Sequence, residues 1–386
     1  MTTQTESPRG PIHVKFEPVR HLFAQMLSDD PNYSAGVCAY VAGEKVVDLV
    51  GGPHLQPTSL TPVFSATKGA AGLCIALLVE RGQLDLDERV ATYWPEFVQG
   101  GKGHVTVRQL LSHQAGLVGV DGGFSAAELN GHDDLARRLA AQTPVWYPGA
   151  AHGYHAVTIG TLADELVRRI TGQTLSAFFE SELRQPTGAD FYIGLPEAEV
   201  ERVQPVRPLP APTPDQMAAA QAIMSLLGPW SPFQQAFGGG HPEFPQDLRD
   251  LGNDPAVWRA GPPAVGGLAS AAGLATVYAS AIMGLNGPPL LSPQTVALVS
   301  QLQTTGPDRV LPVNSAFAVM FMKPTPVIPF GSYRAFGHDG AGGALGFADP
   351  TVDLAFGYVP ASMTWPGGAD PRALALSNAI RVCLMA

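Results

Sequence analysis

The residues in this 386-residue sequence best able to do chemistry together are Ser65 and Lys68, which are three positions apart. On an α-helix, positions i and i+3 lie on one face about 5–6 Å apart, so the lysine amine would stand beside the serine hydroxyl. A serine hydroxyl needs a base, and a lysine can serve where burial or a second cation lowers its pKa. The start of a helix also offers N–H groups and a positive dipole end for an oxyanion. Ser65 is therefore a candidate nucleophile, with Lys68 as its activating partner.

The tetrad alone is weak support for this hypothesis. With 19 serines and 5 lysines in the chain, such a pair arises by chance in about one of four sequences of this composition. An N-capping serine followed by an exposed lysine explains the tetrad as well. The decision depends on the elements around it.

A long apolar run follows the serine. It extends to about Arg81, carries apolar residues on every side of a helix, and meets Gly82, a residue that commonly ends helices. A helix that is apolar all round is normally buried in the middle of a domain. Ser65 would then be held on a rigid central element, as a preorganised nucleophile requires.

A proton carrier is available in Tyr154, which follows a Pro-Gly turn and precedes a helix-like segment. A tyrosinate stabilised by Lys68 in its ammonium form could take the serine proton and return it to a leaving group. With nine tyrosines in the chain, an ordinary core tyrosine fits this position equally well. The glycine-rich stretch from Gly337 to Gly343 would let a backbone approach a substrate closely, or it is simply a hairpin turn.

The order of elements predicts the architecture. A helix and a hairpin open the chain, many helices follow, and short strands with a final helix over 371–385 close it. Strands at both ends must pair to make one sheet. We therefore expect an α/β (α+β type) fold, with a discontinuous sheet domain from 1–85 plus 306–386 and a helical domain with long loops over 86–305. Ser112 and His113 are adjacent, so their side chains point in different directions on a helix. We therefore predict that they do not form a catalytic pair and have structural roles.

Composition limits the partners. The net charge is −10 and no basic run occurs, which argues against nucleic acid and anionic membranes as partners. No membrane span or signal peptide is evident, so we expect a cytoplasmic protein. Metal and cofactor motifs are absent, and the sequence leaves the oligomeric state open. The three cysteines are distant from one another and read as buried free thiols.

Several motifs in the same order together resemble the serine β-lactamase and penicillin-binding-protein superfamily, in the branch of β-lactamase-like carboxylesterases called family VIII. The resemblance covers about residues 30 to 360. It rests on Ser65-Ala-Thr-Lys68, Gly82-Gln-Leu-Asp-Leu-Asp87, Leu110-Leu-Ser-His-Gln-Ala-Gly-Leu117, Pro148-Gly149, Tyr154-His-Ala156, Gly160, Ile170-Thr-Gly172, Gly337-His-Asp-Gly340 and Gly342-Gly343.

This resemblance implies roles for single residues. Ser65 would be the acyl nucleophile, Lys68 its activating partner and Tyr154 the general base and acid. The backbone N–H groups of Ser65 and Ala341 would form the oxyanion hole. The family fold is an antiparallel sheet flanked by helices with an inserted helical domain, and the site lies between them.

Two departures from the β-lactamase pattern bear on the substrate. Ala156 stands where those enzymes carry an amide-bearing asparagine, and His338 stands where they carry a lysine that attracts the substrate carboxylate. A histidine is mostly neutral at pH 7, and the adjacent Asp339 would repel an anion. The resemblance therefore favours a cofactor-free serine carboxylesterase for small neutral esters, with short acyl chains.

Two alternatives remain open from the sequence. One is a β-lactamase, D,D-peptidase or amide hydrolase with the same chemistry, and the other is a silent binding domain on this fold. The resemblance matches the stretch Gly337–Gly343 to the third motif of the family. For the substrate pocket, we expect residues from this third motif, its surroundings and aromatic loops: His338, Asp339, Gly340, His155, Phe124 and Trp365, with the segment 228–263 beside them.

Overall fold

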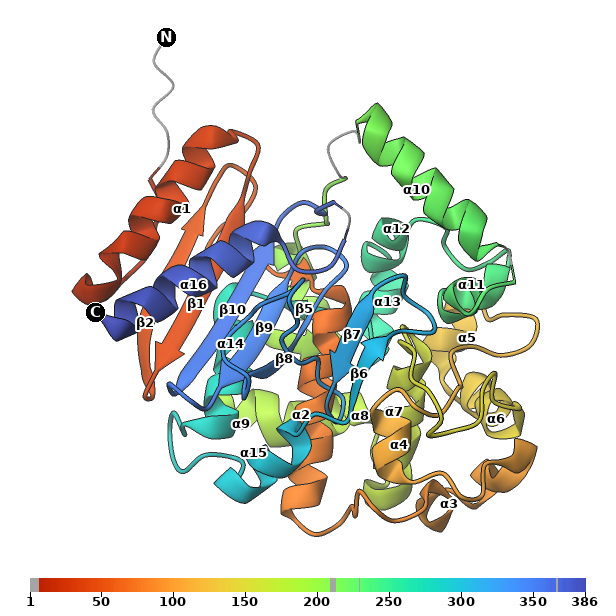
Figure 1. Ribbon diagram of the computed structural model, residues 1–386. Coiled ribbons are helices and arrows are strands. Elements are labelled where there is room, and N and C mark those ends of the chain that lie inside the picture. The colour runs from red at the N-terminus through yellow and green to blue at the C-terminus, as the bar shows by residue number, and fades with distance from the viewer. Residues whose placement is uncertain (1–6, 209–212, 229, 366) are drawn as a thin grey trace.

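The computed structural model describes residues 7–208, 213–228, 230–365 and 367–386. Within these residues, an antiparallel five-stranded sheet combines strands from both ends of the chain (Figure 1). In spatial order the strands are β2 (Glu44–Gly51), β1 (Ala35–Val41), β10 (Leu354–Pro360), β9 (Leu345–Asp349) and β8 (Phe336–Asp339). The predicted antiparallel sheet flanked by helices is confirmed.

Helices cover both faces of this sheet. On one face lie α1 (Glu17–Asp29) and α16 (Pro371–Met385), which pack against each other and enclose an apolar core with the strands. Alternate residues of β1 face different cores, since Val37 belongs to this core and Cys38 to the core on the other face. Because β1 is buried on both faces, its sequence is apolar almost throughout.

The opposite face of the sheet is covered by α14 (Ala271–Ile282). This helix approaches β10 so closely that a Cβ atom at Gly357 would lie 2.3 Å from the carbonyl oxygen of Ala271. Only glycine allows that approach. We predicted this segment as part of the 86–305 helical domain, whereas it packs on the sheet against β1, β9 and β10.

The central element is α2 (Thr67–Glu80), which runs behind the sheet and contacts α7, α8 and α15 of the helical part. Nearly every residue of α2 is buried. The prediction of a buried central helix after Ser65 is confirmed, and all three cysteines are buried free thiols, as predicted.

The remaining helices are short, apart from α7 and α10. In chain order they are η1 (Val14–Phe16), η2 (Phe64–Ala66), α3 (Val90–Tyr93), η3 (Pro95–Gly101), α4 (Val107–Leu111), α5 (Ala126–Gly131), α6 (Asp133–Ala141), α7 (Thr158–Thr171), α8 (Leu175–Phe179), η4 (Glu180–Arg184), α9 (Gln185–Thr187), η5 (Glu197–Arg202), α10 (Pro214–Leu227), α11 (Pro232–Ala236), η6 (Gly238–Gly240), α12 (Leu248–Gly252), α13 (Pro255–Ala260) and α15 (Pro293–Ser300). Within the predicted binding segment 228–263, residue 229 lies outside the described residues, and residues 230–263 alternate short helices with irregular chain.

Two small sheets complete the fold. One has the order β3 (Thr61–Pro62), β5 (Gly267–Ala269) and β4 (Phe191–Ile193), and the other is the hairpin of β6 (Thr304–Pro307) and β7 (Asn314–Phe317). The strand β3 leads directly into the turn that carries Ser65. In the described part of the chain, no helix has both the length and the apolar character needed to cross a bilayer.

Candidate active site

Ser65 lies in η2, the single turn that leads into α2. The preceding residue, Phe64, has a φ of 47°, in the left-handed region that costs a residue with a side chain roughly 1–2 kcal/mol. Its ring is held on two sides, because a Cβ atom at Gly252 or at Gly342 would lie within 2.8 Å of it. The chain therefore turns sharply just before the serine and presents Ser65 at the start of the helix.

The amine of Lys68 stands beside the serine hydroxyl. Its Nζ lies 3.0 Å from Ser65 Oγ and 3.0 Å from the carbonyl oxygen of Ala264. The side chain is fully buried. Burial lowers the pKa of Lys68 well below its ordinary value, although the charge of Asp339 acts in the opposite direction. An uncharged amine at this distance can accept the proton of the serine hydroxyl.

Tyr154 faces the same amine from the other side. Lys68 Nζ lies 4.9 Å from the centroid of the Tyr154 ring, and that ring stacks on Phe317. Burial raises the pKa of Tyr154 far above its usual range, against the smaller effect of a hydrogen bond with Ser65. Burial therefore favours a protonated phenol and a neutral amine. From the sequence we considered the opposite protonation states, a Tyr154 tyrosinate beside a Lys68 ammonium group.

The turn between β8 and β9 packs against the chain just before the nucleophile. A Cβ atom at Gly340 would lie 2.1 Å from the carbonyl oxygen of Val63, so glycine is required for this contact. The next residue, Ala341, donates its N–H to no acceptor within the described ranges. A free backbone donor beside the serine turn is the arrangement that an oxyanion hole needs.

His338 and Asp339 lie at the end of β8, next to the reactive groups. The His338 ring is fully buried, its centroid is 6.0 Å from that of Tyr154, and its Nδ1–H donates to the carbonyl oxygen of Asp339 at 2.7 Å. Burial, with a smaller contribution from Lys68, lowers the pKa of His338 to about 3. Burial raises the pKa of the Asp339 carboxyl to about 6. At pH 7 the third motif thus presents a neutral ring and a carboxylate.

The other residues expected in the pocket have different placements. His155 is fully buried, and both ring nitrogens are used, because Nδ1–H donates to Gly153 O and Nε2 accepts from the N–H of Leu117. Phe124 is also fully buried and packs edge-on against Phe244 in the helical part. His155 and Phe124 therefore pack in the core and offer nothing to a substrate. Trp365, at 37% exposed, keeps a solvent-facing surface.

The packing of His113 against Tyr154 was not predicted from the sequence. Its ring centroid lies 5.3 Å from that of Tyr154 and 4.2 Å from that of Phe317. The local argument that Ser112 and His113 diverge is sound, but it says nothing of Tyr154. The available signal was that His113 lies within the Leu110–Leu117 stretch that carries part of the family resemblance. The resemblance implied no role for this histidine.

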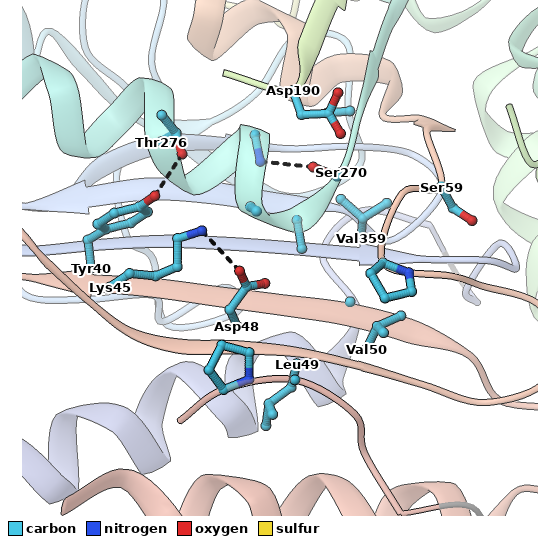
Figure 2. Close-up of a pocket in the computed structure, with 18 of the residues that line it drawn as sticks. Tyr40, Lys45, Asp48, Leu49, Val50, Ser59, Asp190, Ser270, Thr276 and Val359 are labelled. Carbon is cyan, nitrogen blue, oxygen red and sulfur yellow. Dashed lines mark hydrogen bonds and ion pairs between the residues drawn. The ribbon is translucent and has the colours of Figure 1, made fainter. Parts of the chain in front are cut away.

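A cavity of about 590 Å³ lies elsewhere, between the outer strands of the sheet and the start of α14 (Figure 2). Its polar groups mostly satisfy one another, since Lys45 pairs with Asp48 at 3.0 Å and Tyr40 hydrogen-bonds Thr276 at 3.0 Å. None of the reactive residues lines it. Among the described residues, no group of three His, Cys, Asp or Glu side chains is arranged to hold a metal ion.

Comparison with known proteins agrees with this geometry. A family model described as Beta-lactamase matches residues 19–379. The esterase/beta-lactamase LipL of Mycobacterium tuberculosis is 31% identical over 91% of this chain and 82% of its own. Esterase EstB of Burkholderia gladioli is 29% identical over 43% of this chain and 46% of its own.

Solved structures give the same picture over nearly the whole chain. EstA of Arthrobacter nitroguajacolicus is 48% identical, with a TM-score of 0.90 and coverage of 97% of this chain and 98% of that one. A family VIII carboxylesterase is 33% identical, with a TM-score of 0.87 and coverage of 98% and 100%. The family resemblance read from the sequence motifs is confirmed.

Proposed function

This chain belongs to the Beta-lactamase family, and we propose that it is a serine carboxylesterase that hydrolyses small neutral esters through an acyl-enzyme on Ser65. The observation that carries the proposal is the buried Lys68 amine 3.0 Å from Ser65 Oγ, with the Tyr154 ring against the same amine. Relatives named esterases and a family VIII carboxylesterase structure support the choice of ester over other acyl compounds.

Acylation begins when the neutral Lys68 amine takes the proton from Ser65 Oγ as that oxygen attacks the ester carbonyl carbon. The N–H groups of Ser65 and Ala341 stabilise the resulting oxyanion. When the tetrahedral intermediate collapses, the bond to the alcohol oxygen breaks and the Tyr154 hydroxyl donates its proton to the departing alkoxide. The proton held by Lys68 then passes to the Tyr154 oxygen, which restores both groups and leaves an ester on Ser65.

Deacylation uses the same groups in reverse. A water molecule takes the place of the alcohol and transfers a proton to the Tyr154–Lys68 pair as it attacks the acyl carbonyl. The oxyanion again lies against the two N–H groups, and Ser65 Oγ leaves with the proton that the pair returns. No atom or electron from a cofactor enters this balance.

A preference for neutral substrates follows from the third motif. The neutral His338 ring offers no positive charge to a substrate carboxylate, and the Asp339 carboxylate opposes one at pH 7. Ala156 has no amide to hold the side chain of an acylamino substrate. The preference for short acyl chains is carried over from the resemblance.

The test compares wild type with Ser65→Ala, using p-nitrophenyl acetate, p-nitrophenyl butyrate and a chromogenic cephalosporin. Ester turnover and an acyl adduct by intact mass are expected for wild type, and both are expected to vanish in Ser65→Ala. A matched control is Ser28→Ala, because Ser28 is exposed on α1, far along the chain from the site.

Three results would contradict the proposal. Ester turnover that survives Ser65→Ala would remove the nucleophile. A cephalosporin rate well above every ester rate would favour a β-lactamase. Absence of both turnover and adduct in wild type would favour a binding domain.

A further inference from the structure

We propose that His113 and Asp308 are positioning residues, which clamp the main chain around Tyr154 so that its hydroxyl meets the leaving group. The inference rests on the proposed function and deepens it. It concerns the residues that fix the proton donor, since neither His113 nor Asp308 is expected to touch the substrate.

The need for such a clamp comes from the local backbone. Ser65 and Lys68 are held by η2 and α2, whereas residues 151–155 belong to no helix or strand. A side chain on irregular chain has no regular ladder of hydrogen bonds to fix its direction. A displacement of about 1 Å in a catalytic group can cost 10²-fold in rate, so other contacts must supply the rigidity.

Three consecutive N–H groups provide it. The N–H of Gly153 donates to His113 O at 3.1 Å, that of Tyr154 to Asp308 Oδ1 at 3.0 Å, and that of His155 to His113 Nδ1 at 3.0 Å. The acceptors come from two separate parts of the fold, the segment after α4 and the loop between β6 and β7. Tyr154 is therefore held from both sides.

The Asp308 carboxylate is itself immobilised. Its Oδ1 also accepts from the N–H groups of Val310 and Leu311 at 2.8 and 2.9 Å, and its Oδ2 accepts from the Ser315 hydroxyl at 2.6 Å. This carboxylate organises the β6–β7 turn and anchors Tyr154 with the same oxygen. The hairpin also supplies Phe317, on which the Tyr154 ring stacks.

Two features of His113 are energetically unfavourable and would not be expected of an ordinary packing residue. Its φ is 64°, in the left-handed region, and its buried Nε2 finds no hydrogen-bond partner among the described residues. Because Nδ1 accepts from the N–H of His155, the ring proton is on Nε2 and is left unpaired, which is energetically unfavourable for a buried donor. Strain of this kind concentrates where a site requires a particular geometry. His113 supplies an acceptor, Nδ1, to the N–H of His155, and its ring packs against the ring of Tyr154.

Two pairs of variants test whether the hydrogen-bond acceptor on each side chain is what holds the main chain. In each pair, one variant keeps the acceptor atom and the other removes it. His113→Asn keeps an acceptor atom on Cγ and tolerates the positive φ, whereas His113→Gly keeps the backbone conformation and loses acceptor and ring. Asp308→Asn keeps Oδ1, whereas Asp308→Ala removes it. Thermal melting establishes that each variant is folded at the assay temperature.

The readout is the ratio of kcat/KM on p-nitrophenyl acetate to kcat/KM on ethyl acetate, which reports acylation alone because both esters give the same acetyl-enzyme. Nitrophenolate departs without a proton, but ethoxide needs the acid, so a misplaced Tyr154 slows ethyl acetate selectively. We expect His113→Gly and Asp308→Ala to raise the ratio about tenfold or more. His113→Asn and Asp308→Asn are expected to stay within about threefold of wild type. A merely structural loss lowers both rates equally and leaves the ratio unchanged.

Tyr154→Phe completes the test. It is expected to raise the ratio most, and in its background His113→Gly and Asp308→Ala should add no further selectivity, because contacts that act through one group are non-additive. An unchanged ratio in both loss variants overturns the clamp, and so does an equal increase with and without Tyr154. Failure of the proposed function is seen separately, as ester turnover in Ser65→Ala.

Discussion

Lys68 and Lys102 are both 0% exposed, yet their surroundings differ in a way that explains their different chemistry. Lys102 Nζ donates to three carbonyl oxygens, those of Gln99 at 2.6 Å, Ala140 at 2.9 Å and Gln142 at 2.6 Å. These acceptors match the three N–H bonds of an ammonium group. Lys68 has one carbonyl, that of Ala264, and the hydroxyl of Ser65.

The charge state follows from this difference. Burial lowers the pKa of Lys102 to about 8, so the group remains an ammonium at pH 7. Burial lowers the pKa of Lys68 well below its ordinary value, and fewer acceptors are there to hold the charge. A buried lysine with a full set of acceptors joins separate segments as an ammonium, whereas one with fewer acceptors is suited to act as a base, the role that we propose for Lys68.

The largest effect is expected for Lys68→Met. Loss of the base should lower kcat/KM for p-nitrophenyl acetate by about 10³-fold, near the middle of the range for general acid–base catalysis. Stability should fall less than in Lys102→Met, because methionine fills a similar volume and one carbonyl oxygen, that of Ala264, loses its partner in place of three. Steady-state kinetics and urea unfolding measure the two quantities. An active Lys68→Met variant would remove the base from the proposal.

The second prediction concerns pH. Only the neutral Lys68 amine can act, so kcat/KM should fall about tenfold for each pH unit below the pKa of Lys68 in the free enzyme. Because the Asp339 carboxylate raises that pKa, Asp339→Asn should move this acidic limb to lower pH. Profiles of kcat/KM for both proteins test the sign. A shift to higher pH, or none, would contradict the assigned coupling.

The third prediction is the counterpart at the structural lysine. Lys102→Met should leave three carbonyl oxygens unpaired and destabilise the protein by about 3 kcal/mol. Its kcat per folded molecule should remain near that of wild type, because no reactive residue contacts Lys102. Urea unfolding with active-site titration by the acyl adduct separates the two effects. A loss of kcat without a loss of stability would reverse the assignment of the two lysines.

The smallest effect is expected at His132, which extends the comparison to a second residue type. Burial opposes its protonation, but Asp164 and Glu165, each at 2.9 Å from a ring nitrogen, outweigh burial and raise its pKa above the ordinary value. Since the folded pKa is raised, the stabilisation is fully present below about pH 6.5 and is lost as pH rises through the folded pKa.

The measurement for His132 is the difference in urea midpoint between wild type and His132→Gln, taken at pH 6 and at pH 9. The difference should shrink at the higher pH. It should stay smaller than the effect of Lys102→Met at either pH. A difference that grows with pH would show that the ring is neutral in the folded protein.

Much of the site could be predicted because its parts are local in sequence. The spacing of Ser65 and Lys68 places both on one helical face whatever the rest of the chain does, and the apolar run behind them requires burial. The turn after His338 contains its own glycines, so its close approach could be expected. The prediction that His155 and Phe124 line the pocket used adjacency and aromatic content, which say nothing about which way a side chain faces.

From the residues alone one could infer the candidate nucleophile, the lysine beside it, the buried helix and the antiparallel sheet that joins strands from the two ends of the chain. These follow from period, spacing and the short range of helical hydrogen bonds. Local sequence does not set the proton affinities of Lys68 and Tyr154. Burial of Lys68 and Tyr154, the carbonyl of Ala264 and the anchors at His113 and Asp308 depend on contacts between residues far apart in the sequence. Proton affinity is set by that assembled environment, because desolvation and hydrogen bonding act on a group only when the surrounding chain has closed over it.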